Sequence, residues 1–148
     1  METEALELRG AHGWFSMHAR LLEPGVSRLG TVQYIQYAAG GSGFQGTGSS
    51  FVEDEALHQF CRGIYALAEN PTNSVEIRGH EERGLVLSIS PGHSSDLVAV
   101  RGSITMTNVV WPAENSPRYI WGMQFGFWCE AEQLYALRKV SWVRKYAG

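Results

Sequence analysis

The chain has 148 residues, of which 44% are hydrophobic and 18% charged, and its formal net charge is −3. This length and composition are typical of one globular domain that buries its core without disulfides, so we expect a single domain over residues 1–148. Four of the twelve basic residues fall in the last eleven positions, which leaves residues 1–137 with a net charge of −7. An acidic body repels phosphate backbones, so the composition argues against nucleic-acid binding and favours a basic partner.

Targeting signals and disulfides are not indicated. The first ten residues, METEALELRG, carry acids where a secretion signal needs bases, and no stretch approaches the ~18 apolar residues of a membrane span. We therefore expect a soluble, cytoplasmic protein with no membrane partner. Cys61 and Cys129 are too few for a disulfide framework and are predicted to be buried thiols.

The first fifty residues predict four strands. Short apolar runs cover residues 5–10, 14–22 and 31–37, and a fourth strand is predicted to run through a glycine-rich segment and end near Phe51. That segment, GGSGFQGTGSSF (40–51), contains the spacing G-x-G-x-x-G of dinucleotide-binding loops. Such a loop needs a helix to open directly after the glycines, and TGSSF is poor helix sequence. We predict a strand rather than a phosphate site.

A helix is predicted over 53–68. Glu53, Asp54 and Glu55 place negative charge at its start, where the helix dipole is positive. Apolar residues then recur at steps of three and four, which indicates one buried face. Asn70-Pro71 ends the helix.

The second half returns to strand patterns before a final helix. Strands are predicted over 73–79, 85–90, 97–107 and 119–129, with a charged hairpin tip at 80–84 and a loop at 111–117. In the last strand large side chains occupy one face and glycines the other, which suggests that something packs closely on the glycine face. A helix over 130–145 closes the chain. The predicted fold class is α+β, a mostly antiparallel sheet of about eight strands with two helices.

The order of these segments resembles the WapI-type immunity family of bacterial contact-dependent toxin systems. The residues that carry the resemblance are GGSGFQGTGSSF with DEALHQFCRGIYAL (54–67), VEIRGHEERGLVLSIS (75–90), RGSIT (101–105) and FGFWCEAEQLYAL (125–137). In the family the last segment is an F-x-F strand followed by acid-Gln-x-Tyr-Leu. Glu132, Gln133 and Tyr135 fit that pattern, whereas Ala136 stands where the family prefers Leu.

The resemblance implies a cytoplasmic protein that binds and neutralises a cognate toxin without catalysis. It covers about residues 40–137 and transfers no binding residue. It does not identify the toxin, and the sequence leaves the oligomeric state open.

Catalytic and metal-binding patterns are weak. The five histidines form no H-x-H or H-x-x-x-H pair, and the two cysteines are 68 residues apart. No G-x-S-x-G elbow occurs, and SPGHSSD (90–96) has the spacing of turn hydrogen bonds. We expect no catalytic residue, no metal and no cofactor.

Charge and loop placement suggest where a partner would bind. The candidates are Glu53, Asp54, Glu55, Glu81, Glu82 and Trp111. The acids would suit a basic toxin surface, although a helix start and a hairpin tip also explain them. The alternative function is a small-ligand or carbohydrate-binding β-rich module, with strand 119–128 and Trp111 around a pocket. A deep cavity between sheet and helix would favour that alternative, and an enzyme ranks third.

Overall fold

The computed structural model describes residues 4–20, 32–70, 72–79, 84–106 and 121–148. Its elements, in chain order, are β1 (Leu6–Arg9), β2 (Gly13–Arg20), β3 (Val32–Gly41), β4 (Phe44–Glu53), α1 (Asp54–Glu69), β5 (Val75–Arg78), β6 (Leu85–Pro91), β7 (Leu97–Met106), β8 (Trp121–Glu130), α2 (Gln133–Leu137) and α3 (Ser141–Ala147). The predicted hairpin tip, the predicted loop at 111–117 and the residues Glu81, Glu82 and Trp111 lie outside the described residues.

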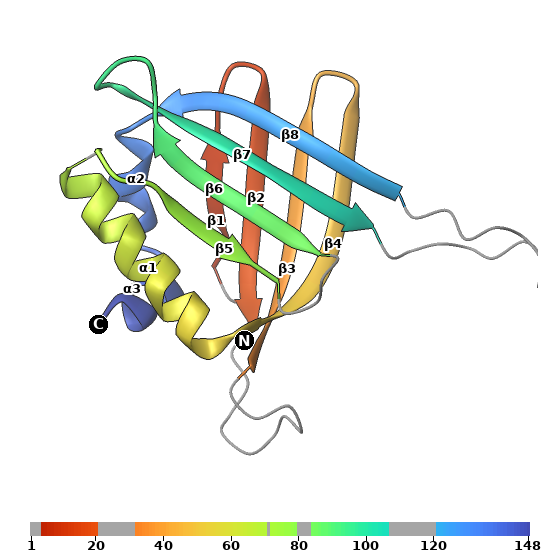
Figure 1. Cartoon of the computed structure of the whole chain (residues 1–148), viewed down its shortest axis with the longest axis horizontal. Coiled ribbons are helices and arrows are strands. Elements are labelled where there is room, and N and C mark those ends of the chain that lie inside the picture. Colours follow the sequence, from red (N-terminus) through yellow and green to blue (C-terminus); the bar gives the residue numbers. More distant parts are fainter. Residues whose placement is uncertain (1–3, 21–31, 71, 80–83, 107–120) are drawn as a thin grey trace, which may run out of the picture.

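The strands form two four-stranded antiparallel sheets, in the orders β1-β2-β3-β4 and β5-β6-β7-β8. The sheets pack face to face with their strands crossing, and the helices gather at one side of the pair (Figure 1). The predicted α+β class with antiparallel pairing is confirmed. The sequence pattern did not show that the strands divide between two sheets, because alternation reports a buried face but not its neighbour.

Alternate side chains from both sheets fill the space between them. Phe15 of β2 stacks on Phe125 of β8, with ring centroids 5.7 Å apart. Helix α1 buries the face predicted from its spacing, which consists of Leu57, Phe60, Cys61, Ile64, Leu67 and Ala68. It packs against α3, α2 and β5, so side chains fill the junction of sheets and helices.

The glycine-rich segment is a β-hairpin. Gly41 pairs with Phe44 across a two-residue turn, Ser42-Gly43, in which Gly43 has the positive φ of 90° that favours glycine. Gly46 lies within β4, and α1 begins only at Asp54. No helix N-terminus in the described part of the chain therefore follows the glycines directly, which agrees with the strand prediction.

The final helix differs from its prediction. The single helix expected over 130–145 is two helices, separated at Val140, whose φ of −67° and ψ of 123° are extended. The break redirects the chain so that Trp142, Val143 and Tyr146 are all buried. A straight helix through Leu137 and Val140 could not keep both segments on the core.

Among the helices that the structure describes, none is long and apolar enough to cross a membrane.

Candidate binding surface

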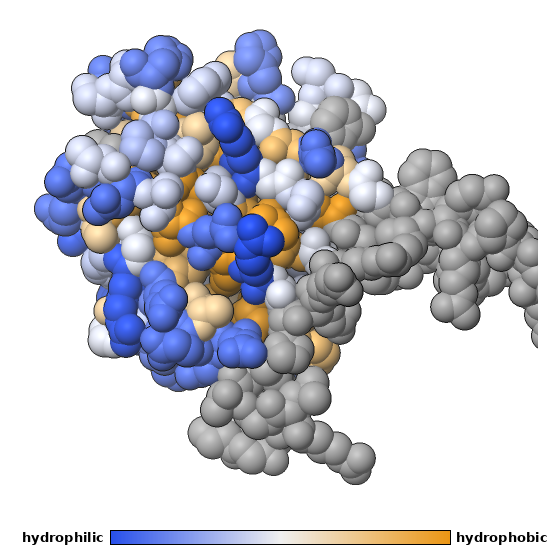
Figure 2. Space-filling model, viewed as in Figure 1, coloured by the Kyte–Doolittle hydropathy of each residue, from blue (hydrophilic) through white to orange (hydrophobic). Residues whose placement is uncertain are grey.

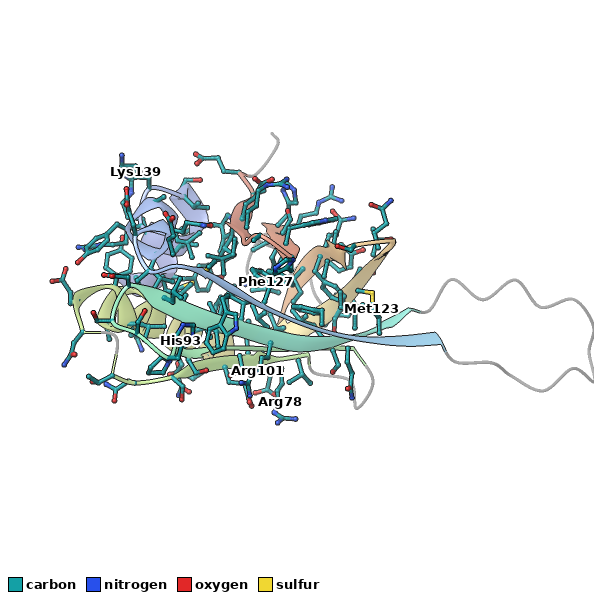
Figure 3. All side chains as sticks on the ribbon, turned by 90° about the horizontal axis from the view of Figure 1, so that it is seen from above. Arg78, His93, Arg101, Met123, Phe127 and Lys139 are labelled. Carbon is teal, nitrogen blue, oxygen red and sulfur yellow. The ribbon has the colours of Figure 1, made fainter. Side chains whose placement is uncertain are left out.

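The outer face of sheet β5–β8 is turned toward the viewer in Figure 1, and the helices lie to one side of the sheet. Hydrophilic and hydrophobic side chains intermix on it (Figure 2). Arg78, Arg101 and His93 point away from the other sheet, whereas Phe127 points between the sheets (Figure 3). Arg78 forms an ion pair with Glu76 at 2.6 Å. Arg101 and its neighbours on β7 and β8 are therefore the better candidates on this face for binding a partner.

Trp128 is an aromatic side chain that its neighbours hold in place on this face. It is 43% exposed although the neighbouring β8 residues Phe127 and Cys129 are buried. The His93 ring meets it edge-on, with centroids 4.8 Å apart and an interplanar angle of 87°. Trp128 pairs in register with Ala99, whose small side chain lies buried beside it. The indole is therefore held against the sheet with much of its surface open to a partner.

Arg101 is the cation beside it. Its register partners are Ser88 on β6 and Gly126 on β8, so small side chains flank it on both sides. A Cβ added at Gly126 would lie 3.7 Å from Arg101 Cγ, which places the arginine stem over that glycine. Among the described residues Arg101 has no ion-pair partner. Its guanidinium is thus available to bind a carboxylate or an aromatic ring.

A groove of about 810 Å³ runs beside these two residues. We call it the Trp128 groove. Its lining consists of Arg9, Gly10, Ala11, His12, Leu97, Ala99, Arg101, Gly126, Phe127, Trp128, Cys129, Glu130 and Gln133. It holds two arginines against one glutamate, so it is locally basic on a protein whose body is acidic.

One wall of the Trp128 groove is the turn between β1 and β2, and local contacts fix its position. A Cβ at Gly10 would collide with the carbonyl oxygen of Trp128, so only glycine allows the turn to lie so close to β8. The Arg9 amide donates to Gln133 Oε1 at 2.8 Å, and Gln133 Nε2 donates to the Arg9 carbonyl at 2.6 Å. The groove is therefore built from separate segments joined by specific contacts.

The described residues offer no obvious nucleophile or metal site. Burial raises the pKa of the Cys61 thiol to about 12. Burial, together with the charge of Glu130, raises the pKa of Cys129 to about 11. Both thiols are then protonated at neutral pH, which makes them poor nucleophiles. Within the described part of the chain, no three His, Cys, Asp or Glu side chains are grouped to hold a metal ion.

The predicted acids at the start of α1 have unequal surroundings. Glu53 and Glu55 are exposed, and Glu55 lies 3.9 Å from Arg62. Asp54 is part of an internal network, because its Oδ1 accepts hydrogen bonds from Gln33 Nε2 at 3.0 Å and from the Tyr146 hydroxyl at 2.9 Å.

These acids do not line the Trp128 groove. In Figure 1 the start of α1 lies at the bottom of the molecule, whereas the β1–β2 turn and the end of β8 lie at the top. Sequence reasoning placed Trp128 on the glycine side of its strand and expected something to pack closely on that face, whereas the indole is 43% exposed among the described residues. It missed Arg101 and His93, since nothing in the sequence shows that the face of β7 and β8 is uncovered.

No family model matches the chain, and no curated protein is significantly similar to it in sequence. Among solved structures the chain is similar to the plant transcriptional regulator PBF-2, with a TM-score of 0.50 and 9% identity. The match covers 98% of this chain and 80% of that one. At this identity the likeness concerns the fold alone.

Proposed function

We propose that this chain is an immunity protein, a non-catalytic domain of the cytoplasm that binds a cognate toxin and blocks its working surface. The proposal starts from the sequence resemblance to WapI-type immunity proteins. The structural observation that carries it is that half-exposed Trp128 and Arg101, which has no ion-pair partner among the described residues, lie two register positions apart on the outer face of β7 and β8. Tryptophan and arginine are the side chains most enriched at the energetic centres of protein interfaces.

In this mechanism the toxin covers the Trp128 groove. Trp128 is already held by His93 and the sheet, so little side-chain freedom is lost on binding. Arg101 then binds a carboxylate or aromatic ring of the toxin as water leaves the groove. Inhibition is steric and needs no turnover.

The acidic residues would act before the groove is covered, while the toxin approaches. Glu53, Asp54 and Glu55 at the start of α1, with Glu81 and Glu82, give the body a negative field that attracts a basic toxin surface. Trp111 would add a second aromatic contact. Because Glu53 and Glu55 are exposed whereas Asp54 is half-buried, we assign Glu53 and Glu55 the larger part in steering.

The second candidate is a small-ligand or carbohydrate-binding module. The Trp128 groove, at about 810 Å³, falls in the usual range of ligand sites, and an exposed indole can stack on a sugar. Against it, the junction of sheets and helices is packed with side chains, and the groove lies outside that junction, along β8 and the β1–β2 turn. A role in transcription, like that of the plant regulator PBF-2, is less favoured because residues 1–137 carry a net charge of −7.

The test begins with capture of the partner. The tagged chain is purified from its native host, and the protein that accompanies it in near-stoichiometric amount is identified. Its C-terminal domain is then expressed in cells with and without this chain. We expect growth arrest without the chain and normal growth with it. A partner that harms no cells, or none at all from cells making a candidate toxin, would contradict the proposal.

Matched variants then locate the interface. We expect Trp128→Ala and Arg101→Glu each to weaken toxin binding by about 30-fold or more, as at an interface hot spot. The control is Tyr135→Ala, which removes another exposed aromatic, 49% exposed, from outside the groove. Equal affinities for all three variants would place the toxin elsewhere, and a raised melting temperature with oligosaccharides alone would favour the second candidate.

A further inference from the structure

The two sheets have four edge strands, of which β1 and β5 are short and covered. An unprotected edge presents unpaired N–H and C=O groups to which another strand can bind. Strand β1 has four residues, and the side-chain amide of Gln133 binds both backbone groups of Arg9. Strand β5 also has four residues and packs against α1. Strand β4 is ten residues long, contacts β6 and β7 of the other sheet and ends in the charged residue Glu53.

Strand β8 is the remaining edge, and its length is ten residues. The amide of Ala131 donates to the Asp96 carbonyl at 2.8 Å, which extends the ladder between β7 and β8. Backbone hydrogen bonding alternates along a strand, so the N–H and C=O groups of the odd-numbered residues of β8 point toward β7. The N–H and C=O groups of the even-numbered residues then point toward the free edge. The carbonyl of Trp128 agrees with this, because it points at Gly10 of the β1–β2 turn.

The open part of the edge is Gly122–Gly126. The β1–β2 turn covers the edge near Trp128, but among the described residues no backbone hydrogen bond from a segment other than β7 reaches 122–126. Residues 121–129 include no charge and no proline, the features that usually block strand addition.

Among the described residues, no contact requires glycine at Gly122 or Gly126. Neither has a positive φ, and an added Cβ would have its nearest neighbours at 4.0 Å and 3.7 Å. Glycine weakens a strand interior, and there it often marks a site of close backbone approach. Together with the unpaired backbone groups, this indicates that a second backbone lies along this edge.

We propose that β8 pairs antiparallel with β8 of a second copy of this chain, about a two-fold axis at Gln124. In this register Gly122 pairs with Gly126 of the second copy, and Gln124 pairs with its own equivalent. The two sheets β5–β8 become one continuous sheet.

The sequence of β8 fits itself in this register. Glycine faces glycine on the outer side, so no side chain obstructs the approach, and the two Gln124 amides can hydrogen-bond to each other. On the inner side Met123 lies opposite Phe125 of the second copy, an apolar pair that continues the core. No like charges meet. The outer faces of the two β5–β8 sheets lie on the same side of the combined sheet, so the dimer presents two Trp128 grooves on one sheet.

The first experiment measures mass by sedimentation equilibrium. We expect the wild-type chain to show twice its monomer mass of 16.4 kDa. Gly126→Pro removes only an edge N–H, since this residue does not bond to β7, and should give the monomer. Gly126→Ala keeps the N–H and should remain dimeric. A monomeric wild type, or a proline variant that associates as strongly as the wild type, would overturn the proposal.

A second experiment covers the case in which the proline variant fails to fold. In a hydrogen-bonded antiparallel pair the two Cα atoms lie ~5.5 Å apart, within the range of a disulfide. Gln124→Cys should therefore form a disulfide-linked dimer under mild oxidation, while Gln45→Cys, at an exposed position on β4, should not. Cys61 and Cys129 are buried and should not interfere. Equal cross-linking of the two variants would count against pairing at β8.

Discussion

The thiol of Cys61 shows how the packing of one residue makes the stability of the fold depend on pH. It lies on the buried face of α1, and burial raises its pKa from 9.0 to about 12. The folded state therefore holds this proton more tightly than the unfolded state does. The stability that results is fully present below pH 9 and is lost as pH rises from 9 towards 12.

We expect the free energy of unfolding to fall above pH 9, with Cys61 contributing up to about 1.4 kcal/mol per pH unit. Urea unfolding at pH 8, 9.5 and 10.5 measures the slope. In Cys61→Ala the whole curve drops because a cavity is created, but the decline above pH 9 becomes shallower. The same slope in both proteins would show that the thiol does not titrate differently on unfolding. Cys129→Ala should change the slope less, because its pKa is raised only to about 11.

At the scale of elements, the glycines of the strands serve different purposes, which alanine substitutions can separate. A Cβ at Gly48 of β4 would lie 2.6 Å from the ring of Tyr37, a buried residue on β3. At Gly122 of β8 the nearest atom is 4.0 Å away. We expect Gly48→Ala to destabilise the fold by about 1–3 kcal/mol through overpacking. Gly122→Ala should change stability by less than about 0.5 kcal/mol. Urea midpoints compare the two, and equal losses would contradict this explanation.

Strands and the first helix could be predicted because their signals are local. Leu85, Leu87 and Ile89 alternate in sequence and are all buried in β6. The end of the chain was mispredicted for a physical reason. Leu134, Leu137 and Val140 keep helical spacing, while the break at Val140 depends on where Trp142 can be buried, which is a tertiary effect.

The candidate site was less predictable than the strands. The Trp128 groove joins the β1–β2 turn, β7, β8 and the start of α2, segments separated by many residues. The alternation of residue types in the sequence indicated that Trp128 and Gly126 share one face of their strand. Arg101 became a candidate only from the structure, which shows that its register partners are Ser88 and Gly126. The acids stood out in the sequence because charge runs are visible there, whether or not a partner binds them.

At the scale of the whole molecule, one polar network ties three parts of the chain together. Asp54 at the start of α1 accepts hydrogen bonds from Gln33 of β3 and from Tyr146 of α3. His58 completes it, with Nε2 3.4 Å from Asp54 Oδ2 and Nδ1 2.9 Å from the Tyr146 carbonyl oxygen. Burial and the hydrogen bond to Asp54 raise the pKa of the Tyr146 hydroxyl.

We expect Tyr146→Phe to lower the free energy of unfolding by about 1.5–3 kcal/mol at pH 7, because a hydrogen bond to a charged group is lost. The matched control is Tyr135→Phe on α2, an exposed tyrosine, which should change it by less than about 0.5 kcal/mol. The raised pKa means that the tyrosine's contribution is present below pH 10 and is lost above it, so the gap between wild type and Tyr146→Phe should narrow at pH 11. Urea unfolding at both pH values measures this gap. Equal effects of the two substitutions would mean that the network does not hold the C-terminal helix to the sheets, and burial of Trp142 and Val143 would then be its main attachment.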